Sequence, residues 1–146
     1  MTVWRLCRRA FAALDGEGAR LYGGRWNSPG HSIVYTSQNL SLAVLQIIVH
    51  LELPPERLPP DYVKIEIQVP DEVSSERCDR LPSTASAMLE LGTRWYQTAA
   101  TAALLVPSVI VPEERNLLLN PGHRDFAKVR AARPRPFGFD SRLFAR

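Results

Sequence analysis

The segment from Tyr62 to Val69, YVKIEIQV, alternates between apolar and polar side chains. One set of alternate positions is entirely apolar (Val63, Ile65, Ile67 and Val69), and the other is polar (Lys64, Glu66 and Gln68). Because successive side chains of a strand point to opposite faces of a sheet, this pattern predicts a strand with one buried face and one face in contact with water. The chain is thereby constrained to a fold that contains a half-buried sheet.

Helices and further strands are predicted on both sides of this segment. Asn39 is a plausible N-cap for a helix from about Leu40 to Glu52, which Pro54 and Pro55 would end. A second helix is predicted over about Ala87–Leu104. Extended segments are predicted at residues 3–6 and 31–37, in LLVPSVIVP, in NLLLNPGH and in the C-terminal FGFDSRLF, the last as an edge strand. Helices and strands mixed without regular βαβ repetition indicate an α+β fold.

The bulk composition is that of a soluble globular protein. The chain has 146 residues, of which 45% are hydrophobic and 23% charged, enough for one domain over residues 1–146 with a real core. Cys7 and Cys78 cannot form a disulfide framework, and they suit a reducing cytoplasm. There is no apolar signal segment at the N-terminus, and the run LAVLQIIV is too short to span a bilayer. We therefore expect a cytoplasmic protein that does not enter the membrane.

Positive charge is concentrated at the C-terminal end. The formal net charge is +3, and the segment from residue 123 to 146 carries seven Lys and Arg residues against two Asp. A basic segment can bind nucleic acid, an acidic partner or an anionic ligand. This one lacks the regular aromatic residues of a single-strand binder, which favours a solvated face or a docking surface for an acidic protein.

The common cofactor motifs are missing from the sequence. His31, His50 and His123 are widely separated and form no metal-binding array, so no metal site is predicted. The chain contains neither a phosphate-binding P-loop nor a GxGxxG dinucleotide motif.

Two candidate residues lie in LYGGRWNSPGHSIVYTS. Arg25 follows a double glycine and precedes Trp26 and Asn27. An arginine on a bent backbone suits bidentate capture of phosphate, although an ordinary surface arginine explains it equally. Tyr35 lies in a predicted strand, where it could stack on an aromatic ring and donate its hydroxyl, or simply be a core residue.

Two further candidates are polar residues in apolar surroundings. Gln46 interrupts SLAVLQIIVHLEL; if its side of the helix is buried, the amide must find partners or cost about 1–3 kcal/mol. A hydrogen-bonded structural glutamine is one explanation. Ser108, in VPSVIVP, is either a tolerated small residue or a hydroxyl that points into a cleft.

Taken in order, these motifs resemble those of the RES domain. The resemblance rests on LYGGRWNSPGHSIVYTSQNLSLAVLQIIVHLE, VPSVIVPEERNLLLNPGH and FGFDSRLF, and it extends from about Val3 to Phe144. RES domains are toxins of bacterial toxin–antitoxin pairs with Xre-type helix-turn-helix antitoxins. Their fold is similar to the ADP-ribosyltransferases: a split β-sheet core with flanking helices and a cleft for NAD. The resemblance implies cleavage of the nicotinamide–ribose bond of NAD, with transfer of ADP-ribose to phosphate, water or a protein, and DNA contact only through the antitoxin.

The resemblance also implies roles for the candidate residues. Arg25 would grip the pyrophosphate, with Trp26 and Asn27 beside it among the NAD-binding residues; Tyr35 would hold the nicotinamide, and Ser108 would orient the ribose or the amide. The family pattern LAxLE places a glutamate where this chain has Gln46. An amide supplies no negative charge to a cationic transition state, a loss that costs about 10²–10³ in rate.

Two explanations of Gln46 follow. It is either an engineered inactivating substitution or the natural residue of a weak or inactive homologue, and in both cases Gln46→Glu is predicted to raise NAD cleavage. The alternative functions are a catalytically silent homologue that binds its antitoxin or a nucleotide, and a basic toxin that acts on RNA.

Overall fold

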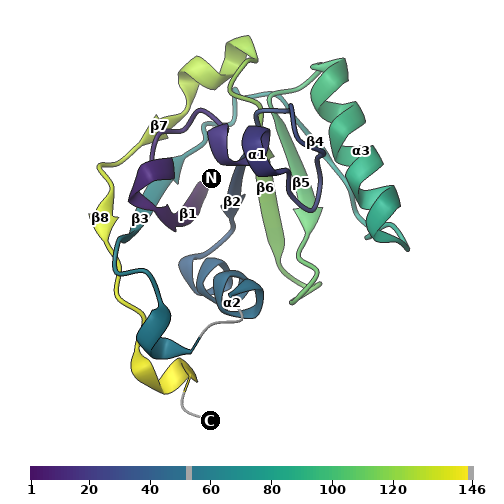
Figure 1. Cartoon of the computed structure of the whole chain (residues 1–146). Helices are drawn as coiled ribbons and strands as arrows, with labels where there is room; N and C mark the ends of the chain where they lie inside the picture. Colours follow the sequence, from purple (N-terminus) through teal and green to yellow (C-terminus); the bar gives the residue numbers. More distant parts are fainter. Residues whose placement is uncertain (52–53, 145–146) are drawn as a thin grey trace.

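An eight-stranded mixed sheet with helices packed on it forms the fold (Figure 1). The computed structural model describes residues 1–51 and 54–144. The strands are β1 (Thr2–Arg8), β2 (Val34–Ser37), β3 (Tyr62–Gln68), β4 (Ser75–Arg77), β5 (Ala103–Pro107), β6 (Arg115–Leu119), β7 (Arg130–Ala131) and β8 (Arg135–Pro136). The α-helices are α1 (Glu17–Tyr22), α2 (Leu40–His50) and α3 (Ala85–Thr98), and 3-10 turns η1–η4 cover Arg9–Phe11, Pro55–Arg57, Arg124–Lys128 and Ser141–Phe144. The predicted α+β class is confirmed.

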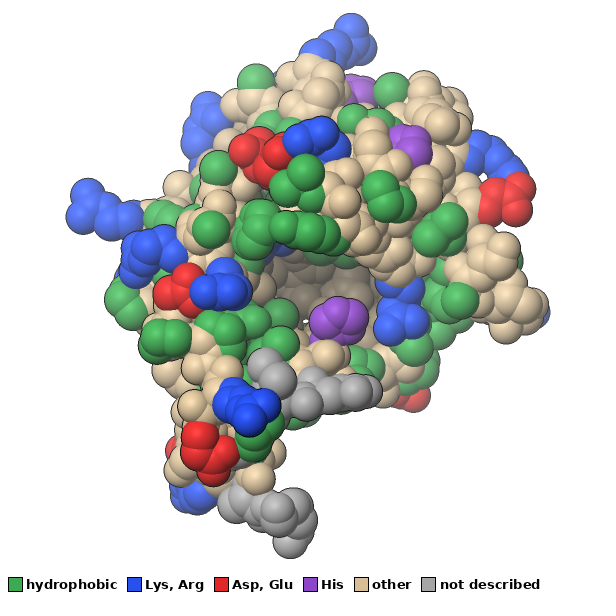
Figure 2. Space-filling view, in the orientation of Figure 1, with side chains coloured by type: hydrophobic (Ala, Val, Ile, Leu, Met, Phe, Trp, Pro, Cys, Tyr) green, Lys and Arg blue, Asp and Glu red, His purple; other side chains and the backbone are tan. Residues whose placement is uncertain are grey.

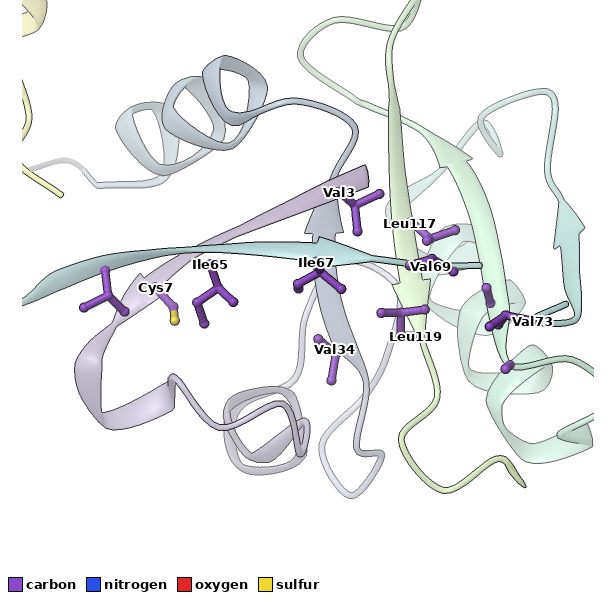
Figure 3. Close-up of a cluster of buried hydrophobic side chains, with 12 residues drawn as sticks. Val3, Cys7, Val34, Ile65, Ile67, Val69, Val73, Leu117 and Leu119 are labelled. Carbon is purple, nitrogen blue, oxygen red and sulfur yellow. The ribbon is translucent and has the colours of Figure 1, made fainter. Parts of the chain in front are cut away.

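The sheet divides into two halves. The strand order is β4-β5-β6-β2-β1-β3-β7, with β8 also paired to β3, and only β4 and β5 run parallel. β1 and β3 share seven residue pairs and β2 and β6 share four, whereas β1 and β2 meet at the single pair Trp4–Ser37. Beyond that pair the two halves diverge, as the crossing of β1 and β2 in Figure 3 shows. The predicted split sheet is therefore confirmed.

Each face of the sheet has its own cover. One face of the sheet, here called the loop face, carries a cluster of buried apolar residues that includes Val3, Val34, Ile65, Ile67 and Leu119 (Figure 3). The opposite face, here called the helix face, carries Leu6 and Tyr62 under α2, and Leu104 and Leu118 under α3. The helices therefore cover the side of the sheet that also carries the polar positions of β3.

The alternation that defines β3 is confirmed by its burial. Val63, Ile65 and Ile67 are at most 1% exposed, while Lys64 and Glu66 remain partly exposed. Burying each such aliphatic side chain contributes about 1.5–3 kcal/mol. The run of three on the loop face is therefore enough to fix the register of β3 against β1.

The predicted helix after Asn39 is confirmed as α2. The Asn39 Oδ1 atom accepts a hydrogen bond from the Leu42 N–H at 2.8 Å, which is the expected N-cap. The last described helical residue is His50, and the predicted terminal residue Glu52 lies outside the described residues.

Two element predictions were wrong, one at the end of a helix and one for a whole strand. The second helix does not reach Leu104; it ends at Thr98, where Ala99 takes a left-handed conformation (φ 54°), and residues 103–107 form β5. Ala103 is completely buried in the sheet, and strand pairing outweighs its helix propensity. FGFDSRLF contains no strand: the Asp140 Oδ1 atom accepts from the Arg142 N–H at 2.9 Å, which starts η4.

Candidate functional site

A cavity of about 320 Å³ opens where the two halves of the sheet diverge. Its wall combines β1, β2 and α2 with single residues of β3 and β6. The lining residues are Trp4, Arg5, Leu6, Cys7, Arg8, Tyr35, Thr36, Ser37, Ala43, Gln46, Ile47, Tyr62 and Asn116. Figure 2 shows a hollow near the centre of one face of the molecule, with histidine, basic and hydrophobic side chains around it.

Gln46 is at the centre of a polar cluster in this cavity. Its Oε1 atom accepts from the Ser37 hydroxyl at 3.1 Å, and its Nε2 atom donates to the Asn116 Oδ1 at 3.0 Å and to the Ser108 Oγ at 3.1 Å. Ser37 and Ser108 are 4% and 0% exposed, and Gln46 is half-buried. The helix therefore presents its one interior amide to three polar side chains that come from β2, β6 and the end of β5.

Ser108 is held so that its hydroxyl points toward position 46. Its Oγ accepts the backbone N–H groups of Ile110 and Val111, both at 3.2 Å, in a turn that follows β5. A hydroxyl oxygen has two acceptor sites and one proton to donate. The two backbone donors already fill these acceptor sites, so the Gln46 Nε2 is a third donor to the same oxygen, whereas a carboxylate at position 46 could accept the Ser108 proton.

Arg25 occupies the tip of a tight turn. Gly24 and Asn27 pair across this turn through a Gly24 N–H to Asn27 O hydrogen bond at 2.9 Å, and Gly23 before it has a φ of 74°. A Cβ atom on Gly24 would lie 2.6 Å from the Tyr35 hydroxyl, so no larger residue fits there. Arg25 is exposed and forms no side-chain hydrogen bond or ion pair within the described part of the chain. Its guanidinium is therefore available to a ligand.

The Tyr35 hydroxyl anchors this turn. It donates to the Asn27 Oδ1 at 2.5 Å and accepts from the Trp26 N–H at 3.1 Å. Burial raises the pKa of the Tyr35 hydroxyl, against smaller opposing effects of the Trp26 N–H and the Arg25 charge. The hydroxyl therefore stays protonated, while the side chain still lines the cavity.

The structure brings the predicted site residues together to different degrees. Gln46 and Ser108 touch directly, and Tyr35 lines the same cavity as Gln46. Arg25 lies on the turn that Tyr35 holds. Trp26 and Asn27, in contrast, face inward: Trp26 is 2% exposed in the core under α3, and the fully buried Asn27 donates to the backbone oxygens of Ala19, Ser28 and His31.

Ser37, Asn116 and Arg5 are among the polar lining residues of the cavity that were not identified from the sequence. Ser37 and Asn116 reach Gln46 only because β2 and β6 pair in register, a contact 79 residues apart in the chain. Arg5 of β1 spans the split, since its guanidinium donates to the Tyr35 carbonyl at 3.2 Å. The only available signal for Arg5 was a charged residue between apolar neighbours in β1, and such a signal does not specify a partner.

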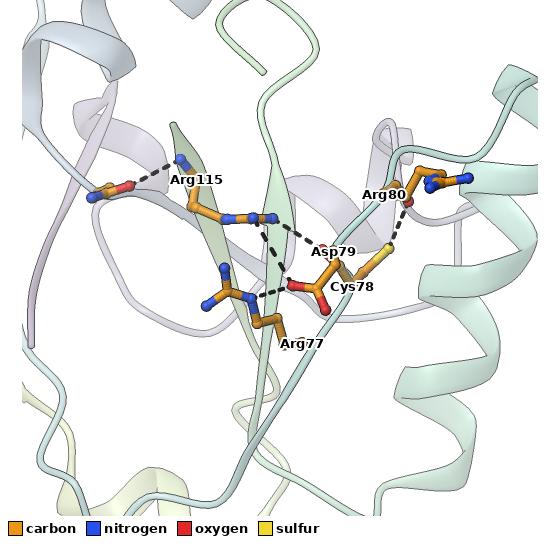
Figure 4. Close-up of polar contacts among 6 residues, drawn as sticks. Arg77, Cys78, Asp79, Arg80 and Arg115 are labelled. Atoms are coloured by element: carbon orange, nitrogen blue, oxygen red, sulfur yellow. Dashed lines mark hydrogen bonds and ion pairs between the residues drawn. The ribbon is translucent and has the colours of Figure 1, made fainter. Parts of the chain in front are cut away.

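The start of β6, next to Asn116, is tied down on its other side. The Arg115 guanidinium donates to the Cys78 carbonyl at 3.1 Å, and its backbone N–H donates to the Gln38 Oε1 at 3.0 Å (Figure 4). Asp79 pairs with Arg77 and lies 4.0 Å from the Arg115 guanidinium. These contacts fix the backbone from which Asn116 extends into the cavity.

Neither a metal cluster nor a membrane helix is found in the described ranges. No group of three or more His, Cys, Asp and Glu side chains there is arranged to hold a metal ion. None of the helices in that part of the chain combines the length and the apolar composition needed to cross a bilayer.

Comparisons with known proteins agree on one family. The chain is 37% identical to the protein named Toxin Res of Photorhabdus laumondii subsp. laumondii, over 98% of this chain and 97% of that protein. It is 38% identical to the Prs ADP-ribosylating toxin of Sphingobium sp., over 97% of this chain and 96% of that protein.

A solved structure has the same fold. A chain in the crystal structure of the M. tuberculosis MbcT–MbcA toxin–antitoxin complex superposes with a TM-score of 0.76 at 17% identity, covering 99% of this chain and 86% of that one. The RES domain family itself matches residues 2–140. With this match and the similarity to relatives over nearly their full length, the chain belongs to the RES domain family.

Proposed function

We propose that the chain is the toxin of a toxin–antitoxin pair, built on a site for cleavage of NAD at the nicotinamide–ribose bond. The names of its relatives, Toxin Res and Prs ADP-ribosylating toxin, support this class. The observation that carries the proposal is the set of groups around position 46. The Ser37 and Ser108 hydroxyls and the Asn116 amide surround it at 3.0–3.1 Å, and all three can donate to a carboxylate.

The cavity and the turn anchored by the Tyr35 hydroxyl supply the groups that this reaction requires. In the reaction the bond from ribose C1′ to the nicotinamide nitrogen breaks, nicotinamide leaves with the electron pair, and positive charge develops on the ribose. Arg25 offers an unpaired guanidinium to the pyrophosphate, and the Tyr35 side chain forms part of the wall against which the nicotinamide would pack. A phosphate, a water or a protein side chain then takes the ADP-ribose.

Position 46 is where the transition state requires negative charge. A carboxylate held by the two serine hydroxyls would stabilise the cationic ribose, whereas the Gln46 amide carries no charge. We therefore expect slow NAD cleavage by the chain as it stands, and an increase of about 10²–10³ in kcat on Gln46→Glu.

The test is nicotinamide release from NAD by the purified protein and its Gln46→Glu variant. The Gln46→Glu/Arg25→Ala double variant is the control, because it retains the carboxylate and loses the proposed pyrophosphate contact. Equal rates for the parent and Gln46→Glu would rule out the role proposed for position 46.

A second candidate is a catalytically silent protein that still binds a nucleotide or its antitoxin. It is favoured by the polar atoms of Gln46, which are all hydrogen-bonded within the cluster. Calorimetric titration with NAD separates the two candidates: the silent binder gives heat of binding without nicotinamide release from either form.

The proposed partner is an Xre-type antitoxin. The structural neighbour was solved as a toxin–antitoxin complex, and this chain presents exposed Arg124, Arg133 and Arg135 that would suit an acidic partner surface. Co-expression with a neighbouring Xre-type reading frame, followed by size-exclusion chromatography, tests this pairing.

A further inference from the structure

Asn116 lies at the centre of a fixed row of residues across the helix face. In register, Val106 of β5, Asn116 of β6, Ser37 of β2 and Trp4 of β1 lie side by side. We propose that Asn116 is a positioning residue, which orients the side chain at position 46 and turns its own amide to match the residue found there. The catalytic part of this inference rests on the proposed NAD cleavage.

In the present chain the Asn116 amide offers its acceptor side to position 46. Its Oδ1 lies 3.0 Å from the Gln46 Nε2 and 2.9 Å from the Ser37 Oγ. The Ser37 hydroxyl has one proton, which it can donate either to the Asn116 Oδ1 or to the Gln46 Oε1. The Gln46 N–H donates to the Asn116 Oδ1 in both cases. In this arrangement the Gln46 nitrogen, and not its oxygen, faces β6.

The amide of Asn116 is free to turn over. Its Nδ2 has no hydrogen-bond acceptor among residues 1–51 and 54–144, and the side chain is only half-buried. Its backbone, in contrast, is paired on both sides, to Ser37 and to Val106. A half-turn of the amide would thus place Nδ2 where Oδ1 now accepts from Gln46 and Ser37, and it would disturb no hydrogen bond of the described residues beyond those two.

With a carboxylate at position 46, the turned amide donates where it now accepts. The Asn116 N–H of β6, the Ser37 hydroxyl of β2 and the Ser108 hydroxyl of the turn after β5 would then all donate to the carboxylate. An asparagine can do this because its two ends are alike in shape and opposite in hydrogen bonding. An aspartate cannot, since both of its oxygens only accept.

The test is Asn116→Asp, made in the parent protein and in the Gln46→Glu variant. In the parent, the new carboxylate still accepts from Gln46, and Tm should shift by less than about 2 °C. In the Gln46→Glu background, two carboxylates would meet at hydrogen-bonding distance, and Asn116→Asp should lower Tm by about 6 °C more than it does in the parent.

Asn120→Asp is the matched control. Asn120 follows the same strand, is 4% exposed, and accepts from the Gly122 N–H at 2.9 Å without touching position 46. Asn120→Asp should therefore shift Tm by the same amount in both backgrounds. If Asn116→Asp also shifts Tm by the same amount in the parent and in the Gln46→Glu background, the proposal is overturned, whatever the activity of the Gln46→Glu variant.

Kinetics separate positioning from mere structural support. In the Gln46→Glu background, Asn116→Ala should lower kcat about tenfold or more while KM for NAD changes less than about threefold, because only the orientation at the reacting atom is lost. An unchanged kcat overturns the positioning role. A Gln46→Glu protein that releases no nicotinamide, yet shows the Tm coupling, contradicts the proposed function and leaves the pairing of Asn116 with position 46 intact. If both single variants fold and the Asn116→Asp/Gln46→Glu double variant does not, the two substitutions destabilise each other, which supports the pairing of Asn116 with position 46.

Discussion

Removing one oxygen atom, by Tyr35→Phe, tests whether Tyr35 acts through its hydroxyl or through its ring. The hydroxyl is the hydrogen-bond partner of two groups, the Asn27 Oδ1 at 2.5 Å and the Trp26 N–H at 3.1 Å. Asn27 and Trp26 are 0% and 2% exposed, so water cannot readily replace the lost oxygen. The variant keeps the ring in the cavity and leaves a buried donor and a buried acceptor without partners.

The expected cost follows from those two orphaned groups. Each buried unsatisfied polar group costs about 1–3 kcal/mol, so the free energy of unfolding should fall by about 2–6 kcal/mol. For a domain of this size that corresponds to a decrease in Tm of about 6–18 °C.

Urea unfolding and thermal melts measure this loss. Tyr22→Phe is the control, because Tyr22 is 75% exposed and its hydroxyl has no partner in the described part of the chain; it should lie within about 0.5 kcal/mol of the parent. In the Gln46→Glu background, Tyr35→Phe should raise KM for NAD more than it lowers kcat, since the turn that carries Arg25 loosens while the ring remains. Equal stability of the two Phe variants would refute the anchoring role.

Two further predictions concern packing and pH. A Cβ atom on Gly92 of α3 would lie 2.0 Å from the Trp26 carbonyl oxygen, so Gly92→Ala should lower the free energy of unfolding by about 3 kcal/mol or more; a urea titration that gives the parent's midpoint would contradict this contact. The Ser74 backbone N–H, 3.0 Å from the Asp125 Oδ2, is the main cause that lowers the pKa of Asp125 to about 2. Because this pKa is depressed in the folded state, the stabilisation is present above about pH 4 and is lost as the pH falls toward 2. Asp125→Asn should therefore make the decline of Tm between pH 4.5 and 2.5 shallower than in the parent, and parallel profiles by circular dichroism would contradict the assignment.

The local elements that the sequence predicted were those with strong short-range signals. The alternation of β3 and the Asn39 cap of α2 each depend on residues within one element, and both were confirmed. FGFDSRLF also looks extended, but the Asp140 side chain bonds to the backbone two residues on and produces a 3-10 turn instead. In that case a single local hydrogen bond competes with strand propensity, and composition does not predict which prevails.

The candidate site was predictable only in part, for a different physical reason. Gln46 and Ser108 were visible because each is a polar residue in an apolar run. Ser37 and Asn116 carry no such mark, since their importance arises from the register of β2 on β6. Trp26 and Asn27 stand next to Arg25 in the chain, yet the turn directs them into the core, so adjacency in the sequence did not imply a shared cavity.

The order in which the sheet is connected has a consequence for synthesis on the ribosome. β1 is made first, but its partner β3 begins at Tyr62, and Gln46 meets its last partner only when Asn116 has been made. A nascent chain that stops short of β6 has Arg25, Tyr35 and Gln46 but lacks Asn116 and the strand that carries it. If the chain is the toxin proposed above, this topology would delay assembly of the cavity until most of the chain has been synthesised, and an antitoxin made at the same time could then bind before the site is complete.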